Sequence, residues 1–155
     1  MKLLFKQRLF SWFDSYDIYD EAGDTAYIVR GKMAWGHRFD IFDRYDQYVG
    51  RVKEKMLRML PSFEFSIGEQ PIGEIRKELT FLRPKYTLRY NGWTVSGNMM
   101  GWDYQIFDAS GARAAAVSKQ LFRMTDTYII DIPDPQNALT ALMIVLSIDA
   151  ANCTR

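Results

Sequence analysis

The chain has 155 residues, a net charge of +1 at pH 7, 48% hydrophobic residues and 15% aromatic residues. This length and composition predict one globular domain over residues 1–155 and exclude a disordered chain. The balanced charge argues against nucleic acid as a partner and leaves only local patches of charge to consider. A single cysteine, Cys153, excludes an internal disulfide and a cysteine-based metal site, and it is typical of a reducing, cytoplasmic setting.

The first ten residues, MKLLFKQRLF, mix charged with apolar side chains and contain no small-residue cleavage site. A secretory signal has an uninterrupted apolar segment followed by such a site. We therefore expect this segment to belong to the fold, with a strand near residues 3–10.

Between this segment and Pro133 the chain consists of short stretches in which apolar and polar residues alternate. Alternation of this kind indicates β-strands with one buried face, and Gly, Asn or Asp residues between the stretches indicate turns. With the N-terminal strand the total is about twelve strands. The other stretches are residues 16–20, 25–30, 38–42, 48–56, 62–67, 71–77, 85–90, 93–97, 104–107, 112–122 and 127–132.

Several of the expected turns have a recognisable chemistry. Asn91-Gly92 separates two strands by two residues and predicts a type I′ hairpin, which needs positive φ angles. Asp20–Gly23 and Asp108–Gly111 are acidic turns that end in glycine. Hairpins of this kind recur along the chain as a degenerate internal repeat.

The last element is a helix of about residues 135–152. Asp134 is a suitable N-cap, and Pro135 fits the first helical position. Apolar residues occupy every side of this helix, so it must be surrounded. Its apolar run is about 14 residues long, whereas a membrane span needs about 20, so we expect a buried core helix rather than membrane insertion or partner docking.

A meander of this many strands must protect its edges, and closing into a barrel does so. Such a barrel is too wide for strand side chains alone to fill. The sequence therefore predicts a mainly β fold, a closed antiparallel barrel of about twelve strands that encloses the C-terminal helix.

This pattern resembles the LURP-one-related family of the tubby C-terminal-like superfamily, which also includes the phospholipid scramblases. The resemblance spans nearly the whole chain and contains no catalytic signature. The features that carry it are FDIFD (39–43) with GRVK (50–53), YQIFD (104–108) with Gly111, the strand of Lys119, and Asp131–Pro133 before the apolar helix.

The resemblance implies a twelve-stranded barrel around a central helix. Tubby-like relatives bind phosphoinositide headgroups through basic residues on the barrel surface. Scramblase relatives add calcium-binding and palmitoylated regions, and the sequence has neither.

The candidate ligand-binding residues are basic. Arg51, Lys53 and Lys55 alternate along one strand and point to one face, and Arg89 is a further candidate for the same surface. Such a patch suits a phosphate headgroup or an anionic membrane. The alternative is an ordinary solvated strand face with edge-protecting lysines.

Catalytic and metal sites are not indicated. The acidic stretches lack the ligand spacing of a calcium loop and read better as turn residues. His37, the only histidine, has no cysteine or activated serine partner in the sequence. No cofactor is expected. The tryptophans and methionines, including those in the loop of residues 97–102, suit either a barrel core or an apolar rim that faces a ligand or membrane.

The sequence thus favours a non-enzymatic binding module that recognises anionic phospholipid through a basic barrel surface, located in the cytoplasm or at the membrane periphery. The alternative function is a structural or regulatory domain that binds another protein. Sequence names no residue of a catalytic site.

Overall fold

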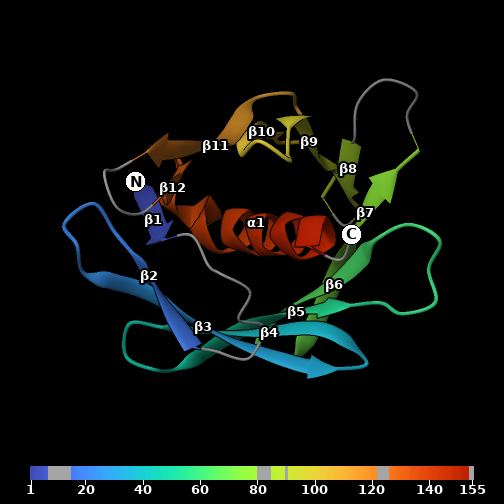
Figure 1. Cartoon of the computed structure of the whole chain (residues 1–155), viewed down its shortest axis with the longest axis horizontal. Helices are drawn as coiled ribbons and strands as arrows, with labels where there is room; N and C mark the ends of the chain where they lie inside the picture. Colours follow the sequence, from blue (N-terminus) through green and yellow to red (C-terminus); the bar gives the residue numbers. More distant parts are fainter. Residues whose placement is uncertain (7–14, 80–84, 90, 122–125, 154–155) are drawn as a thin grey trace.

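The computed structural model describes residues 1–6, 15–79, 85–89, 91–121 and 126–153. The chain forms a closed antiparallel barrel of twelve strands around one helix, α1, as predicted from the sequence (Figure 1). The strands are β1 (Lys2–Lys6), β2 (Ser15–Tyr19), β3 (Thr25–Ala34), β4 (Gly36–Asp43), β5 (Tyr48–Glu54), β6 (Ser62–Ile67), β7 (Gln70–Glu78), β8 (Lys85–Leu88), β9 (Trp93–Asn98), β10 (Asp103–Phe107), β11 (Arg113–Leu121) and β12 (Asp126–Asp131).

Each strand pairs with the next one in sequence, and β1 pairs with β12 to close the barrel. The closing pair is regular from Lys2 opposite Asp131 to Lys6 opposite Thr127. The contact of β1 with β2 is recorded by one pair, Leu4 opposite Tyr19. Closure leaves none of the twelve strands as an open edge, which is the advantage of a barrel over an open sheet.

The helix begins as the sequence predicts. The Asp134 side chain accepts a hydrogen bond from the backbone N–H of Gln136 at 3.0 Å, and Pro135 starts a short 3-10 turn, Pro135–Asn137. The α-helix α1 follows as Ala138–Cys153 and runs through the middle of the barrel (Figure 1). Each of residues 141–148 is buried, so the apolar surface on all sides of the helix is covered by the barrel wall.

The wall approaches the helix most closely at Gly50 on β5. A Cβ added to Gly50 would lie 2.5 Å from Met143 Cε and 2.7 Å from the backbone oxygen of Ser66. No side chain fits in that space without displacing its neighbours. The glycine therefore allows β5 and α1 to pack together.

Three turns share one geometry. Asp20, Asp43 and Asp108 each accept hydrogen bonds through Oδ1 from two backbone N–H groups, two and four residues further on, at 2.9 to 3.0 Å. The fourth residue of each turn has a positive φ angle, at Gly23, Asp46 and Gly111. The aspartates of the internal repeat thus build turns, as the sequence suggested.

One local prediction is wrong. Strand β8 ends at Leu88, which pairs with Trp93, and the N–H of Gly92 donates to the Leu88 oxygen at 3.0 Å. Four residues therefore connect the strands, instead of a two-residue type I′ turn at Asn91-Gly92. The Asn91 side chain accepts from the N–H of Trp93 at 3.1 Å, so it is used in a longer turn.

Candidate anion-binding site

Three basic residues stand side by side on the outer wall of the barrel. Arg38 on β4 is the direct cross-strand partner of Lys32 on β3 and of Lys53 on β5. Adjacent strands lie about 4.8 Å apart, so these residues, here called the cation row, span about 10 Å. Lys32 and Lys53 are exposed and Arg38 is partly exposed. Like charges placed directly opposite one another destabilise a sheet, so the cation row requires a counter-charge.

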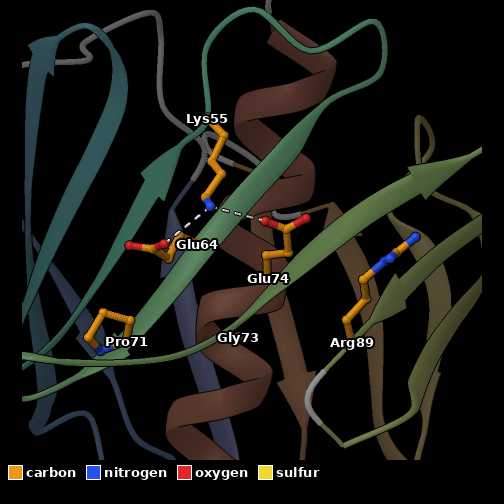
Figure 2. A pocket seen from close by; sticks show the side chains of 6 residues that line it. All are labelled: Lys55, Glu64, Pro71, Gly73, Glu74 and Arg89. Carbon is orange, nitrogen blue, oxygen red and sulfur yellow. Dashed lines mark ion pairs between the residues drawn. The ribbon is translucent and has the colours of Figure 1, made fainter.

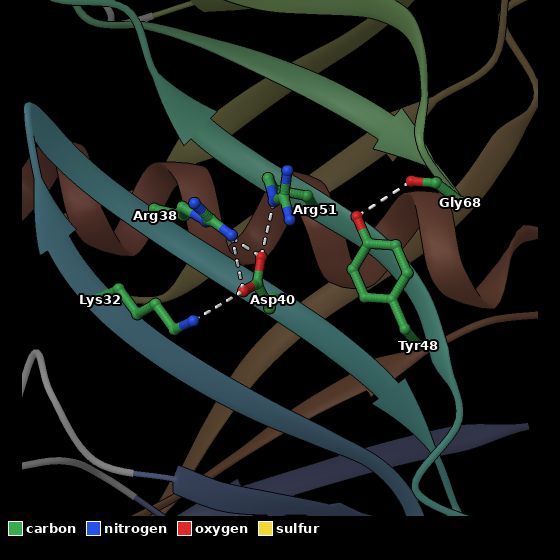
Figure 3. A network of polar contacts seen from close by, with 6 residues as sticks. All are labelled: Lys32, Arg38, Asp40, Tyr48, Arg51 and Gly68. Atoms are coloured by element: carbon green, nitrogen blue, oxygen red, sulfur yellow. Dashed lines mark hydrogen bonds and ion pairs between the residues drawn. The ribbon is translucent and has the colours of Figure 1, made fainter.

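Asp40 supplies one negative charge beside the cation row. Its Oδ1 accepts from Arg51 Nε at 2.7 Å and from Arg38 Nε at 3.2 Å. Its Oδ2 accepts from Arg38 Nη2 at 3.1 Å and lies 3.6 Å from Lys32 Nζ. Figure 3 shows this cluster on the side of β4 and β5 turned away from α1. Three cations, Lys32, Arg38 and Arg51, thus share the Asp40 carboxylate, which leaves an excess of two positive charges, while Lys53 has Glu64 directly opposite it on β6.

Burial and the neighbouring arginines act in opposite directions on the pKa of Asp40. Burial of Asp40, whose side chain is 7% exposed, opposes ionisation. The hydrogen bonds and charges of Arg38 and Arg51 together outweigh this burial, so the pKa of Asp40 lies below its usual value. The hydrogen bond from Arg51 to Asp40 in turn raises the pKa of the guanidinium. Asp40 and Arg51 are therefore both ionised at neutral pH.

Neighbouring contacts hold Arg51 in place. Its guanidinium carbon lies 5.6 Å from the centroid of the Tyr48 ring. The Tyr48 hydroxyl donates to the backbone oxygen of Gly68 at 2.9 Å, which ties β5 to the turn after β6 (Figure 3). A guanidinium has five N–H donors, and within the described residues Arg51 uses one of them on Asp40. The remaining donors suit an additional anionic oxygen.

Lys55 and Arg89, two of the predicted ligand-binding residues, lie elsewhere. They border a shallow hollow of about 280 Å³ together with Glu64, Gly73 and Glu74 (Figure 2). Lys55 Nζ lies 3.3 Å from a carboxylate oxygen of each glutamate, so its charge is already compensated. Burial opposes ionisation of Glu74, but hydrogen bonds from Arg76 and Lys55 outweigh it and lower its pKa. Arg89 is exposed and points away from these ion pairs (Figure 2).

The structure thus divides the residues nominated from the sequence. It places Arg51 and Lys53 in one cluster, and Lys55 and Arg89 beside a carboxylate-lined hollow. Sequence reasoning did not identify Lys32, Arg38 and Asp40 as part of the cluster. Their spacing of six and two residues gives no sign that they meet Lys53, and only a correct register of β3, β4 and β5 reveals it.

Other candidates have structural roles. His37 lies on β4, where its Nδ1 is 2.7 Å from Glu54 Oε2 and its backbone N–H donates to the same oxygen at 2.9 Å.

Over the part of the chain that is described, no group of three or more histidine, cysteine or acidic residues could hold a metal ion. None of the described helices is both long and apolar enough to cross a membrane.

Comparisons with known proteins agree with the fold. The profile of the LURP-one-related family matches residues 1–149. The uncharacterized protein YxjI of Bacillus subtilis (strain 168) is 29% identical over 149 residues, which cover 94% of this chain and 91% of that protein. An X-ray structure of an Arabidopsis thaliana protein matches with a TM-score of 0.65 and 13% identity, covering 99% of this chain and 92% of the plant chain. At that identity the plant structure supports the fold alone.

Proposed function

The chain belongs to the LURP-one-related family, and from this premise we propose that it is a non-enzymatic binding module that holds anionic phospholipid headgroups against the outer wall of its barrel. The site is the cation row with Arg51. One observation carries the proposal: Lys32, Arg38 and Lys53 occupy directly paired positions on three adjacent strands, with the single buried carboxylate of Asp40 beside Lys32 and Arg38.

The positive charge of the site favours binding of an anion. A row of like charges costs stability in the free protein, and a bound phosphate would turn this cost into attraction. Asp40 orients two arginines and compensates only part of the charge, so the cluster is preorganised and still positive. Each basic residue close to an anionic membrane contributes about 1 kcal/mol of binding free energy. The site is exposed on a convex wall, which suits a headgroup at a surface better than a substrate that needs enclosure.

The test is co-sedimentation with vesicles of phosphatidylcholine alone, and of phosphatidylcholine with phosphatidylserine or a phosphoinositide. We expect retention by the anionic vesicles only. The variant K32E/K53E removes two exposed cations and should bind at least about 30-fold more weakly, since about 2 kcal/mol of attraction is lost. Free inositol phosphates added as competitors distinguish recognition of the phosphate group from recognition of a lipid surface.

The matched control is K2E/R113E, which changes the net charge equally. Both control residues are exposed, at the first residues of β1 and β11, and both strands lie outside the β3–β5 wall. The control should bind like the wild type. If both variants lose vesicle binding equally, net charge and not the cation row determines binding. If the wild type does not bind anionic vesicles, the proposal is wrong. Recovery of one stoichiometric protein partner without lipid binding would favour the competing function, a protein-binding domain.

A further inference from the structure

Among the described residues, large apolar side chains are exposed mainly at one end of the barrel. Because consecutive strands are antiparallel neighbours, the odd-numbered strands finish at one end of the barrel and the even-numbered strands at the other. The Asn152 side chain, near the end of α1, donates to the Met99 oxygen in the connection after β9 at 3.1 Å. The end of the barrel at which the odd-numbered strands finish, and at which α1 also ends, is here called the exit end.

The exit end carries six of the nine large hydrophobic residues that are exposed among the described positions. Leu57 and Met59 are fully exposed, and Trp35 is 86% exposed. These six residues, here called the apolar rim, belong to the connections after β3, β5, β7 and β9 and are Trp35, Met56, Leu57, Met59, Leu79 and Met100. In Figure 1 the connection after β5 extends to the right, past the end of α1. Soluble surfaces seldom gather apolar side chains in this way without a binding role.

The backbone of the apolar rim is strained at one of its exposed residues. Leu57 has a φ angle of 63°, a left-handed conformation that non-glycine residues seldom adopt. Its side chain gains no burial in the free protein that would offset this strain. A Cβ added to Gly36 would lie 2.8 Å from Met56 Sδ, so the connections after β3 and β5 pack against each other. Strain that the folded chain does not offset locally is characteristic of binding loops.

Charge distinguishes the two ends. The turns at the opposite end, where α1 begins, carry the carboxylates of Asp20, Glu21, Asp24, Asp43, Asp46, Glu69 and Asp108. At the exit end, exposed Arg58 lies between Leu57 and Met59, and the cation row begins directly behind Trp35. An anionic bilayer therefore attracts the exit end and repels the opposite end.

The spacing of apolar and basic groups matches a membrane interface. Lys32 precedes Trp35 by three residues and Arg38 follows it by three, which is about 10 Å along a strand. Apolar faces of interfacial proteins enter about 5 to 10 Å into the boundary between headgroups and acyl chains. With Trp35 at that depth, the cation row lies at the level of the headgroups.

We propose that the exit end is the membrane-contacting face, with the apolar rim inserted into the interface of an anionic bilayer. The inference rests on the proposed function and adds two elements to it, a defined orientation and an apolar contact that salt does not screen. The cation row then holds headgroups behind the inserted loops.

The experiment measures tryptophan fluorescence with vesicles of phosphatidylcholine and phosphatidylserine whose acyl chains are brominated. The difference between the wild type and W35F reports Trp35 alone, and we expect this signal to be quenched. The variant L57N/M59S should bind these vesicles about tenfold to a hundredfold more weakly, because two apolar side chains no longer leave water. The control Y45S/I67S removes exposed apolar residues at the opposite end and should leave binding unchanged.

The possible failures are distinguishable. If Trp35 is not quenched and L57N/M59S binds like the wild type, while binding still requires anionic lipid, insertion is wrong and the headgroup site stands. If the apolar rim is required but neutral and anionic vesicles bind equally, the headgroup site is wrong and insertion stands. If vesicles are not bound and L57N/M59S elutes at a smaller size than the wild type, the apolar rim is a contact between copies of the chain and both proposals fall.

Discussion

Arg38 and Lys53 stand directly opposite one another on β4 and β5, two positive charges at one level of the sheet. A like-charge pair at directly opposite positions costs about 0.2 to 1 kcal/mol relative to a neutral pair, and Asp40 beside Arg38 and Glu64 opposite Lys53 offset part of this cost. The folded state therefore contains a charge arrangement that an anion improves and that the unfolded chain does not offer. Binding and folding stability are linked through these residues.

We expect anions to raise the melting temperature of the wild type. At a ligand concentration of about 100 times Kd the gain in unfolding free energy is about 2.7 kcal/mol. Differential scanning calorimetry with inositol hexakisphosphate checks this expectation, with glucose as a neutral control. The K32E/K53E variant should show a much smaller shift, and an equal shift in that variant would place the anion elsewhere.

The variant D40N should destabilise the fold at pH 7 by about 1 to 3 kcal/mol, because two arginines lose their charged acceptor. The pKa of Asp40 is lowered in the folded state, so its contribution is present above the unfolded pKa of about 3.9 and is lost as the pH falls through the folded pKa. The gap between the wild type and D40N should therefore shrink below about pH 4. Urea unfolding across this range measures it, and a gap that stays constant would show that Asp40 acts through packing.

Binding to anionic vesicles should consist of two components with different salt dependence. Screening shortens from about 10 Å at 0.1 M salt to about 3 Å at 1 M, so the contribution of the cation row should fall over this range. The contribution of the apolar rim should persist. Titration of vesicle binding with NaCl tests this separation, and complete loss at high salt would leave no apolar contact.

Leu57→Asn should stabilise the protein slightly, by about 0.5 kcal/mol, because asparagine tolerates a positive φ angle better than leucine. The same substitution should weaken membrane binding. Thermal unfolding of L57N beside M59S, which has no such backbone constraint to relieve, checks the first effect. A lower melting temperature for L57N would mean that the Leu57 side chain supports the fold.

Gly50→Ala should cost about 1 to 3 kcal/mol of unfolding free energy, since the added methyl group meets Met143 and the Ser66 carbonyl. Adding Met143→Ala removes one of the two collisions and should recover part of the loss relative to Met143→Ala alone. A double-mutant cycle by chemical denaturation measures this coupling. Additive effects would show that β5 and α1 adjust independently.

Leu142→Asp should prevent folding, because Leu142 is fully enclosed by the barrel and an unpaired buried charge is too costly. The comparison is Gln136→Asp, which adds a charge at an exposed position before α1 and should be tolerated. The yield of soluble protein distinguishes the two. A rise in solubility for Leu142→Asp would instead be typical of a membrane anchor.

The fold was predictable because its causes are local. Alternation marked the strands, Asp134 and Pro135 marked the start of the helix, and a helix apolar on all sides required an enclosing wall. The four-residue connection after Leu88 was missed because the Asn-Gly pair lies inside a longer turn. Turn length depends on which residues pair across the strands, which local composition does not determine.

The candidate site was predictable only along a single strand. Arg51 and Lys53 share a face because alternation within β5 requires it. Whether Lys32 and Arg38 join them, and whether Glu64 and Glu74 neutralise Lys55, depends on the register between strands. Charge compensation is a relationship between residues distant in sequence, so the cation row emerges only in three dimensions.

The central helix follows all twelve strands in the sequence, and β1 closes the barrel against β12. During synthesis, the early strands therefore emerge from the ribosome long before either their closing partner or the segment that fills their interior. Contacts of such long sequence separation make folding slow. Nascent hairpins therefore keep one apolar face exposed to water until α1 has been synthesised. We expect the nascent protein to need protection from aggregation during this time.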